Sequence, residues 1–211
     1  MLFRYGAPAK TPGLLKSIFK KRVWSLPKGN NCVYLTFDDG PTPGVTDWVL
    51  DILKSYNIKA TFFCIGKNVT ANPEIYDRII REGHRVGNHT HNHLNGWKTN
   101  TPEYLQNIAK ASEVINSKLF RPPYGKTSLK QASFLHKKGY KIIMWDVLAI
   151  DWDKSLTSKK CYKNVMDNTE DGSIIVFHDS IKASKNLKKI LPGIIKDLSG
   201  MGYSFGVIPL E

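Results

Sequence analysis

The chain has 211 residues, of which 41% are hydrophobic and 23% are charged, with a formal net charge of +13 at pH 7. This length suits one globular domain with a substantial core, and the composition excludes a disordered or fibrous chain. The apolar runs are too short to span a bilayer, and the amino-terminus has neither a continuous apolar stretch nor a small-residue cleavage site. With no signal peptide in the sequence, we expect a cytoplasmic protein.

The positive charge could attract an anionic partner such as nucleic acid, a lipid surface or an acidic polysaccharide. No nucleic-acid motif accompanies it, and the basic clusters are spread over separate parts of the chain: Lys20-Lys21-Arg22, Lys137-Lys138, Lys159-Lys160 and Lys188-Lys189. We therefore expect no nucleic-acid partner, at most a weak association with an anionic surface, and a monomer.

Three cysteines, Cys32, Cys64 and Cys161, cannot all pair within the chain. Two of them fall inside expected strands, where buried free thiols are common. Reduced thiols are therefore expected, which favours a reducing compartment.

The first 29 residues differ in character from the rest of the chain. They contain three prolines, at positions 8, 12 and 27, and a short basic amphipathic stretch from Leu14 to Lys20. We expect residues 1–29 to form a basic extension whose apolar face packs on a catalytic domain of residues 30–211. A helix lying on a membrane surface is the alternative, although one or two turns bury little area.

From residue 31 onward, expected strands alternate with expected helices. Apolar runs predict strands at 32–37, 59–65, 84–87, 119–124, 141–147, 173–177 and 203–208. Helical spacing and cap residues predict helices from an N-cap at Thr46 to 56, at 73–83, at 101–116, after a cap at Ser128, at 158–168 and at 187–198. Near-continuous apolar strands that alternate with helices indicate a parallel sheet, and about seven such units indicate a closed α/β barrel.

Two adjacent carboxylates follow the first expected strand. The apolar run from Cys32 to Phe37 ends at Asp38 and Asp39, and Gly40-Pro41 then turns the chain. Such a strand delivers both acids to its carboxyl end, the rim at which α/β proteins place active sites. Two buried neighbouring carboxylates repel each other, so the pair favours a nearby cation. An Asp-Gly turn without a chemical role is the alternative.

A histidine-rich stretch, His89-Thr90-His91-Asn92-His93, follows the third expected strand. On a helical turn His89 and His93, four residues apart, share one face and can bind one cation. With one aspartate they make a His₂Asp set, which is typical of catalytic zinc sites that keep positions for water and substrate. The second aspartate is then close enough to act as a base. The alternative, a histidine-rich surface loop, is disfavoured by the carboxylate pair.

Three further segments place polar side chains after expected strands. Arg121 begins Arg121-Pro122-Pro123-Tyr124-Gly125 and offers a fixed fork of donors to a carboxylate. Asp151 could orient an imidazole, and Trp152 could form the wall of an apolar pocket. His178 directly follows a fully apolar strand. The respective alternatives are a surface turn, a loop cap beside a core tryptophan, and a structural histidine.

These segments, in this order, resemble the five motifs of the polysaccharide deacetylases of carbohydrate esterase family 4, the chitooligosaccharide deacetylase homology domain. The resemblance covers the chain from about residue 33 to the carboxyl terminus. Its motifs are Thr36-Phe37-Asp38-Asp39-Gly40-Pro41, His89-Thr90-His91-Asn92-His93, Arg121-Pro122-Pro123-Tyr124-Gly125, Asp151-Trp152 and Val176-Phe177-His178.

The resemblance implies a distorted (β/α)₇ barrel with one divalent metal ion, usually zinc, with cobalt or another divalent ion as alternatives. By the same resemblance, Asp39, His89 and His93 hold the metal. Asp38 is then the general base and His178 the general acid.

The resemblance also implies roles for the remaining motif residues. Arg121 would orient Asp38, and Asp151 would support His178. The Tyr124 backbone N–H would stabilise the oxyanion, while Trp152 and Val176 would line the acetyl pocket.

The chain departs from the family pattern at two positions. Val176 stands where a leucine is usual, and Leu148 stands where many members carry an acid. The first change would slightly reshape the acetyl pocket, and the second would alter the contacts around the fourth motif. All proposed metal-binding and acid–base side chains are nevertheless present, which argues against an inactive relative.

The expected function is therefore metal-dependent hydrolysis of the N-acetyl group of N-acetylhexosamine units in a glycan such as peptidoglycan or chitooligosaccharide. One alternative is an O-acetyl esterase that acts on xylan or another polysaccharide with the same site. The other is a basic binding module on an inert barrel. Because relatives usually act on wall or capsule glycans, an extracytoplasmic or membrane-associated location is the alternative to a cytoplasmic one.

Overall fold

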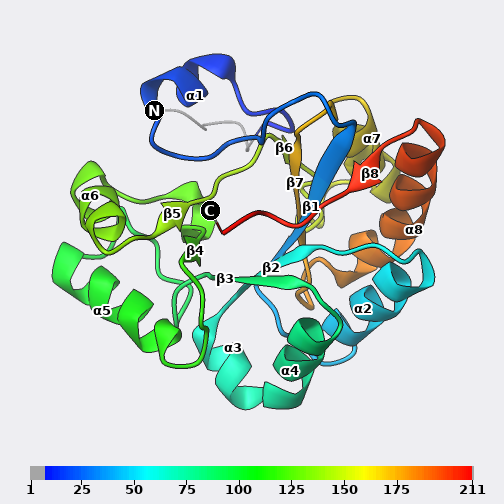
Figure 1. Cartoon of the computed structure of the whole chain (residues 1–211). Coiled ribbons are helices and arrows are strands. Elements are labelled where there is room, and N and C mark those ends of the chain that lie inside the picture. The colour runs from blue at the N-terminus through cyan, green and yellow to red at the C-terminus, as the bar shows by residue number, and fades with distance from the viewer. Residues whose placement is uncertain (1–7, 211) are drawn as a thin grey trace.

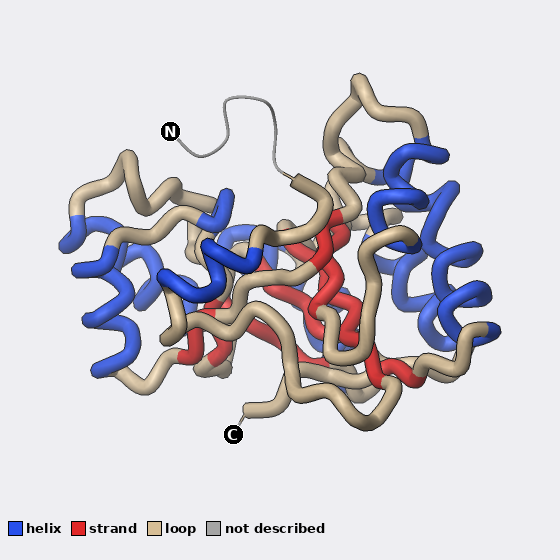
Figure 2. Tube along the Cα trace, turned by 90° about the horizontal axis from the view of Figure 1, so that it is seen from above, coloured by secondary structure: helices blue, strands red, loops and turns tan. Residues whose placement is uncertain are grey.

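A computed structural model describes residues 8–210 as a parallel sheet curled into a barrel, with helices around its outside (Figure 1). Residues 1–7 of the expected extension, and residue 211, lie outside the described residues. In Figure 2 the strands lie in the interior with helices on both sides. The strands are β1 (Cys32–Asp38), β2 (Thr61–Cys64), β3 (Arg85–Asn88), β4 (Leu119–Phe120), β5 (Lys141–Ile142), β6 (Val147–Leu148), β7 (Ile174–His178) and β8 (Ser204–Phe205).

Helices connect most of the successive strands, as parallel pairing requires. They are α1 (Gly13–Ile18), α2 (Thr46–Ser55), α3 (Gly66–Ala71), α4 (Pro73–Arg81), α5 (Thr101–Ser112), α6 (Leu129–Lys137), α7 (Ser158–Met166) and α8 (Ser184–Gly200), with a 3₁₀ turn η1 at Pro123–Gly125. The paired order is β5-β4-β3-β2-β1-β7-β6, and β8 adds to β1. This order confirms the expected distorted (β/α)₇ barrel.

The prediction of one strand at 141–147 is wrong: the chain forms two short strands there, because the neighbouring strand with which it pairs changes within this stretch. β5 pairs with β4, whereas β6 pairs with β7, and no helix separates the two. Between them, residues of the amino-terminal segment supply the missing contacts: Val23 N–H donates to the Ile142 carbonyl at 2.9 Å, and Met144 N–H donates to the Val23 carbonyl at 2.7 Å. The barrel is thus completed by a segment from outside the repeating units.

Helix α1 lies in the part of the ring between α6 and α7, where the β5–β6 connection has no helix (Figure 1). The expected apolar face is only half used: Leu15 and Phe19 pack on the barrel, but Leu14 and Ile18 are 73% and 61% exposed. Lys10 Nζ donates to Asp146 Oδ2 at 2.7 Å, and Lys16 pairs with the other oxygen of the same buried carboxylate. Ion pairs therefore contribute to holding this segment beside apolar packing.

Some expected boundaries differ from the structure. Thr46 is the first residue of α2, and its N-cap is Val45, because the Thr46 hydroxyl bonds elsewhere in the fold. The short helix α3 was not expected, and α8 extends beyond 187–198 at both ends with Pro192 inside it. The strand expected at 203–208 shortens to β8. By contrast, Ser128 caps α6 in a complete capping box, as expected.

The core lies between the sheet and its helices. Phe37 on β1 stacks on Phe62 of β2 and on Phe177 of β7, with ring centroids 5.1 and 5.7 Å apart. Such aromatic packing across three neighbouring central strands makes this part of the barrel rigid. The residues that end these strands are therefore held on a stable support.

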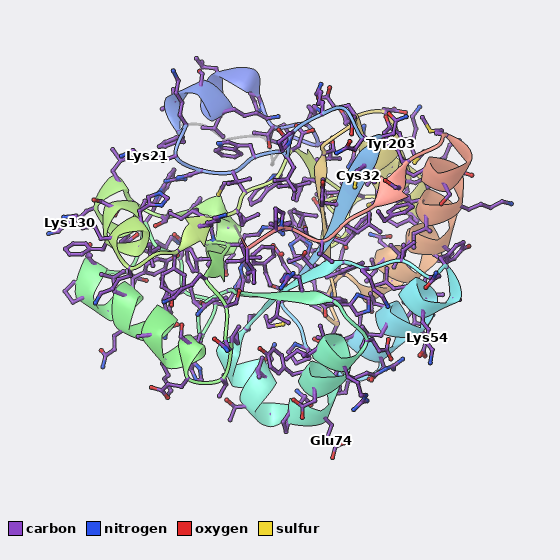
Figure 3. The ribbon with its side chains drawn as sticks, viewed as in Figure 1. Lys21, Cys32, Lys54, Glu74, Lys130 and Tyr203 are labelled. Atoms are coloured by element: carbon purple, nitrogen blue, oxygen red, sulfur yellow. The ribbon has the colours of Figure 1, made fainter. Side chains whose placement is uncertain are left out.

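Basic side chains are spread around the molecule: Lys21 after α1, Lys54 on α2 and Lys130 on α6 lie at separate points of the periphery (Figure 3). All three cysteines are free thiols, as expected. Within residues 8–210, no helix has the length and apolar character needed to cross a membrane.

Candidate active site

The sequence-predicted side chains converge at the carboxyl ends of the central strands. In the strand register, Asp38 at the end of β1 lies opposite His178 at the end of β7. His89 follows β3 directly, and its N–H donates to the carbonyl of Cys64, the last residue of β2, at 2.9 Å. Parallel strands end at one edge of a sheet, so residues far apart in sequence meet here.

Asp39, His89 and His93 form a compact cluster whose candidate ligand atoms all lie within 4.8 Å of one another. Asp39 Oδ1 is 3.3 Å from His93 Nε2 and 3.8 Å from His89 Nε2. Asp39 reaches this position through a left-handed backbone, with φ of 84°. The histidines do not share a helical turn as expected. They converge from a loop in which Thr90 and His93 have φ of 63° and 57°.

The cluster fits a divalent cation. Asp39 Oδ1 is enclosed and has no hydrogen-bond partner among the described residues. Burial, with the neighbouring His93, lowers the pKa of His89 to about 3, and burial also lowers the pKa of His93. His89 Nδ1 lies 2.7 Å from the Arg121 carbonyl oxygen. Because a carbonyl can only accept, the proton of the neutral imidazole is on Nδ1, and Nε2 keeps a lone pair that can bind a metal ion. Two neutral imidazoles and one carboxylate suit zinc or a similar ion.

Asp38 is held by a fully buried arginine. Arg121 Nη1 donates to Asp38 Oδ1 at 2.7 Å and lies at the same distance from Thr36 Oγ1. The other guanidinium nitrogens donate to the carbonyls of Ile143 and Met144. These carbonyls belong to the stretch between β5 and β6 where the chain changes partner, so the irregular backbone provides acceptors that orient the arginine.

His178 is held by Asp151. Asp151 Oδ1 lies 2.9 Å from His178 Nδ1, and Asp151 Oδ2 accepts the His178 backbone N–H at 2.8 Å. Burial lowers the pKa of His178, but the charge and hydrogen bond of Asp151, together with Asp39 and Asp38, outweigh burial and raise the pKa to about 9. The imidazole is therefore protonated at neutral pH. Its Nε2 can donate a proton toward the site.

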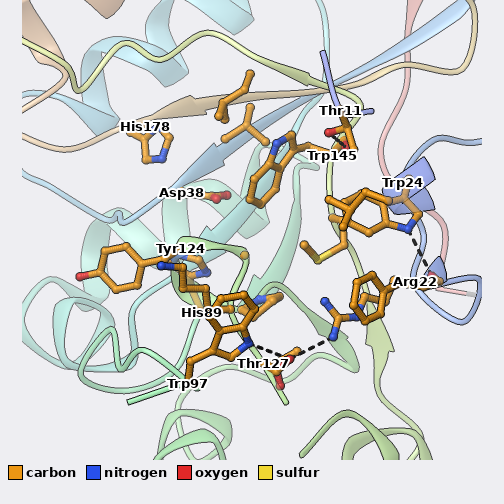
Figure 4. A pocket seen from close by; sticks show the side chains of 18 of the residues that line it. Thr11, Arg22, Trp24, Asp38, His89, Trp97, Tyr124, Thr127, Trp145 and His178 are labelled. Carbon is orange, nitrogen blue, oxygen red and sulfur yellow. Dashed lines mark hydrogen bonds between the residues drawn. The ribbon is translucent and has the colours of Figure 1, made fainter. Parts of the chain in front are cut away.

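Tyr124, Trp152 and Val176 line one cavity with Asp38, Asp39, His89, His93 and His178 (Figure 4). The Trp152 ring packs against His178 with centroids 4.5 Å apart, and the Tyr124 ring packs against His93 at 4.6 Å. Tyr124 has a left-handed backbone with φ of 59°. Every sequence-predicted site residue is thus brought to this cavity or directly supports a residue that lines it.

The sequence interpretation missed Asp179, which has no exposed surface. Its Oδ1 accepts the Gly40 N–H at 3.0 Å, its Oδ2 accepts the Thr46 hydroxyl at 2.6 Å, and its own N–H donates to the Asp38 carbonyl at 3.1 Å. A Cβ on Gly40 would lie 2.0 Å from Asp179 Oδ2, so only glycine fits there. A carboxylate immediately after His178 was the available signal. Asp179 thereby fixes the turn that carries Asp38 and Asp39.

A curled parallel barrel whose rim carries a possible metal-binding His₂Asp cluster between a carboxylate and a protonated histidine has the arrangement of a hydrolase. Residues 25–143 match the family model described as polysaccharide deacetylase. The chain belongs to the polysaccharide deacetylase family, as its motifs predicted.

Known relatives cover most of this chain. A peptidoglycan-N-acetylglucosamine deacetylase of Bacillus cereus is 38% identical over 188 residues, which is 84% of this chain and 66% of the relative. A peptidoglycan-N-acetylmuramic acid deacetylase of Bacillus subtilis is 35% identical over 196 residues, or 87% of this chain and 40% of the relative. The chain thus spans less than two thirds of the length of either relative.

A solved structure is similar over nearly the whole chain. It is the Bc1960 peptidoglycan N-acetylglucosamine deacetylase in complex with 4-naphthalen-1-yl-N-oxidanyl-benzamide. The similarity has a TM-score of 0.87 at 35% sequence identity, and covers 94% of this chain and 95% of that one.

Proposed function

We propose that this protein is a metal-dependent deacetylase that hydrolyses the N-acetyl group of N-acetylhexosamine units in a glycan and releases acetate. One observation carries the proposal. Asp38 and His178 are register partners on β1 and β7, and they line the same cavity as the Asp39, His89 and His93 cluster. A base and an acid on neighbouring strands beside a cation site are what amide hydrolysis requires.

Asp39, His89 and His93 would hold the divalent ion, with zinc as the expected ion and cobalt as an alternative. When bound, such an ion supplies positive charge that polarises the acyl carbonyl and makes water more acidic. The enclosed Asp39 oxygen and the two neutral imidazoles support this assignment. The Arg121 carbonyl fixes the His89 tautomer.

Asp38 would take a proton from the attacking water. Its Oδ1 is occupied by Arg121, which leaves Oδ2 for the water. The guanidinium is itself anchored on two carbonyls, so the hydrogen bond that orients the carboxylate comes from a fixed donor. A base fixed in this way costs little reorganisation when the reaction occurs.

His178 would give its proton to the departing nitrogen. The leaving group of an amide is a poor one until it is protonated, so the reaction depends on an acid. A pKa of about 9 keeps His178 protonated at neutral pH, and Asp151 holds its Nδ1 so that Nε2 faces the reacting group. The carbon–nitrogen bond breaks, water supplies the hydroxyl of acetate, and the sugar keeps a free amine.

The acyl group would lie against Trp152 and Val176, which line the cavity beside His178. The backbone N–H of Tyr124, which lines the cavity in a left-handed conformation, would donate to the oxyanion. The deacetylases named above support a peptidoglycan-type or related acetylated glycan as substrate. The exposed aromatic Trp97 on the same cavity is a surface on which a neighbouring sugar ring could stack.

The test is acetate release by chelator-stripped protein, with and without added zinc or cobalt, from N-acetylated chitooligosaccharide and from acetylated xylan. We expect metal-restored release from the N-acetylated substrate. Asp38→Asn and His178→Ala should each lower kcat by about a hundredfold or more. The exposed Asp167→Asn, which removes the same charge outside the cavity, should leave kcat unchanged.

Three outcomes would contradict the proposal. Release from acetylated xylan alone would assign the site to an O-acetyl ester. Full activity without metal would remove the role of the Asp39 cluster, and full activity of both the Asp38 and His178 variants would remove the acid–base pair.

A further inference from the structure

The cavity that contains the acid–base pair continues away from it beneath the amino-terminal segment. Its volume is about 770 Å³, far more than an acetyl group needs. Beyond Trp145, its walls include Leu15, Phe19, Trp24 and Met144. In Figure 4, Trp145 lies between Asp38 on one side and Trp24 on the other. The cavity therefore has a second, largely apolar compartment that the deacetylation mechanism does not use.

Arg22 is the charged group of this compartment. Its side chain lines the cavity, although the residue is only 8% exposed. Nη2 donates to the Thr127 carbonyl at 3.0 Å, and the guanidinium lies over the Phe19 ring at 4.3 Å (Figure 4). Within residues 8–210, no carboxylate pairs with Arg22, and its Nε and Nη1 make no hydrogen bond. Burial accordingly lowers the pKa of Arg22.

A buried guanidinium without a counter-ion is costly. Arg121, for comparison, is wholly buried but pairs with Asp38 at 2.7 Å. Nε and Nη1 of Arg22 are unused within the described part of the chain, in a compartment whose walls include Phe19 and Trp24, so they are available to an anion that enters. The compartment thus has the character of an anion site that the chain does not fill with an acid of its own.

We propose that Arg22 forms a carboxylate subsite in the compartment beyond Trp145. One guanidinium balances one negative charge, and its planar fork matches a carboxylate, whereas a phosphate monoester carries up to two charges. The apolar walls suit the carbon atoms attached to that carboxylate. This inference rests on the proposed function only for the origin of the ligand.

The carboxylate could have two sources. It could be the acetate released beside Trp152 and Val176, which would pass Trp145 on leaving the site. It could instead be a carboxylate carried by the glycan, such as the lactyl group of a muramic acid unit. Both sources place one carboxylate on Arg22, and the enzyme kinetics described below distinguish the two sources.

Binding is tested on metal-free protein, so that the Asp39 cluster holds no ion for the probe to bind. Sodium acetate and N-acetylmuramic acid are titrated while the indole N–H signals are followed by NMR. We expect saturable shifts of Trp24 and Trp145, and none of Trp48, which lies on α2 outside the cavity. Arg22→Gln should weaken binding by roughly tenfold or more, since it removes charge-assisted hydrogen bonds. The exposed Lys137→Gln, with the same charge change, should bind as the wild type does.

Arg22→Lys keeps the positive charge but loses the planar pair of donors. It replaces Arg22→Gln in the binding titration if Arg22→Gln does not fold. It should weaken binding of the probe by about threefold or more. A wild-type titration without saturable shifts of Trp24 and Trp145 would overturn the subsite. So would equal binding by the wild type and the Arg22 variants.

Kinetics with zinc-loaded protein identify the source. If the glycan carries the carboxylate, Arg22→Gln raises KM for a muramic acid substrate by about tenfold and leaves neutral chitooligosaccharide unchanged. If acetate is the ligand, the variant weakens inhibition by added acetate on both substrates. If Arg22→Gln alters neither KM for the muramic acid substrate nor inhibition by acetate, the subsite has no role in the reaction. Absence of turnover in the wild type would refute the deacetylase proposal alone, because the binding result comes from metal-free protein.

Discussion

The buried carboxyl of Asp179 should make the protein less stable as pH rises, and replacing it with asparagine should remove that loss. Asp179 has no exposed surface and accepts hydrogen bonds from Gly40 and Thr46. Burial raises its pKa from 3.8 to about 7 and outweighs the hydrogen bond from Thr46, which lowers the pKa; the charge of Asp39 adds to the rise. The folded protein therefore holds this proton more tightly than the unfolded chain does.

The magnitude follows from that difference of about 3 pKa units, at 1.36 kcal/mol for each unit. The folded-state pKa is the higher one, so the stabilisation is complete below about pH 4 and is lost as pH rises through about 7. The loss amounts to about 4 kcal/mol. Asparagine resembles the protonated acid: its oxygen can accept the Gly40 N–H, and its amide can donate to Thr46 Oγ1. Asp179→Asn should thus gain about 4 kcal/mol over the wild type between about pH 4 and pH 8.

The assay is urea unfolding of chelator-treated wild type and Asp179→Asn at intervals across this pH range. Taking the difference between the two proteins at each pH cancels the titration of the other groups. A constant offset of about 1 kcal/mol from altered hydrogen bonds is acceptable. The matched variant Asp167→Asn, at an exposed carboxylate, should track the wild type throughout. A difference between Asp179→Asn and wild type that stays level with pH would refute the reasoning.

Three other perturbations follow from the site and the amino-terminal segment. Asp151→Asn removes the charge that holds the pKa of His178 near 9, so the alkaline limb of the pH profile of kcat should move to lower pH by about one unit or more. An alkaline limb that does not move would contradict the role of His178 as the acid. His93→Ala should reduce zinc content from about one per chain to near zero by elemental analysis, and full retention of zinc would place the ion elsewhere. Asp146→Asn weakens the ion pairs with Lys10 and Lys16, so the backbone N–H of residue 11 should exchange with deuterium about tenfold faster or more. Unchanged protection of this N–H would show that packing alone holds the amino-terminal segment.

The side chains of the catalytic rim could be found from the sequence because each follows an apolar strand directly. Asp38 at the end of β1, His89 after β3 and His178 at the end of β7 carry this pattern, and in a parallel sheet it specifies a place as well as an element. Expectations that depended on local geometry were less successful. His89 and His93 meet through left-handed loop residues and not on a helical turn.

What the sequence by itself determined was the alternation of strand and helix, hence the barrel, and the set of polar residues at its rim. Only the tertiary structure decided which groups those residues face. Thr46 gives up a helix cap to bond Asp179. Residues 143–146 leave the strand pattern, so that Ile143 and Met144 accept hydrogen bonds from Arg121 and Met144 donates one to the Val23 carbonyl. The fold also sets the ionisation of His178 by placing Asp151 against it, and it leaves Arg22 without a carboxylate partner among the described residues. Local periodicity records which face of an element is apolar, but the partner of a buried polar group comes from a distant part of the chain.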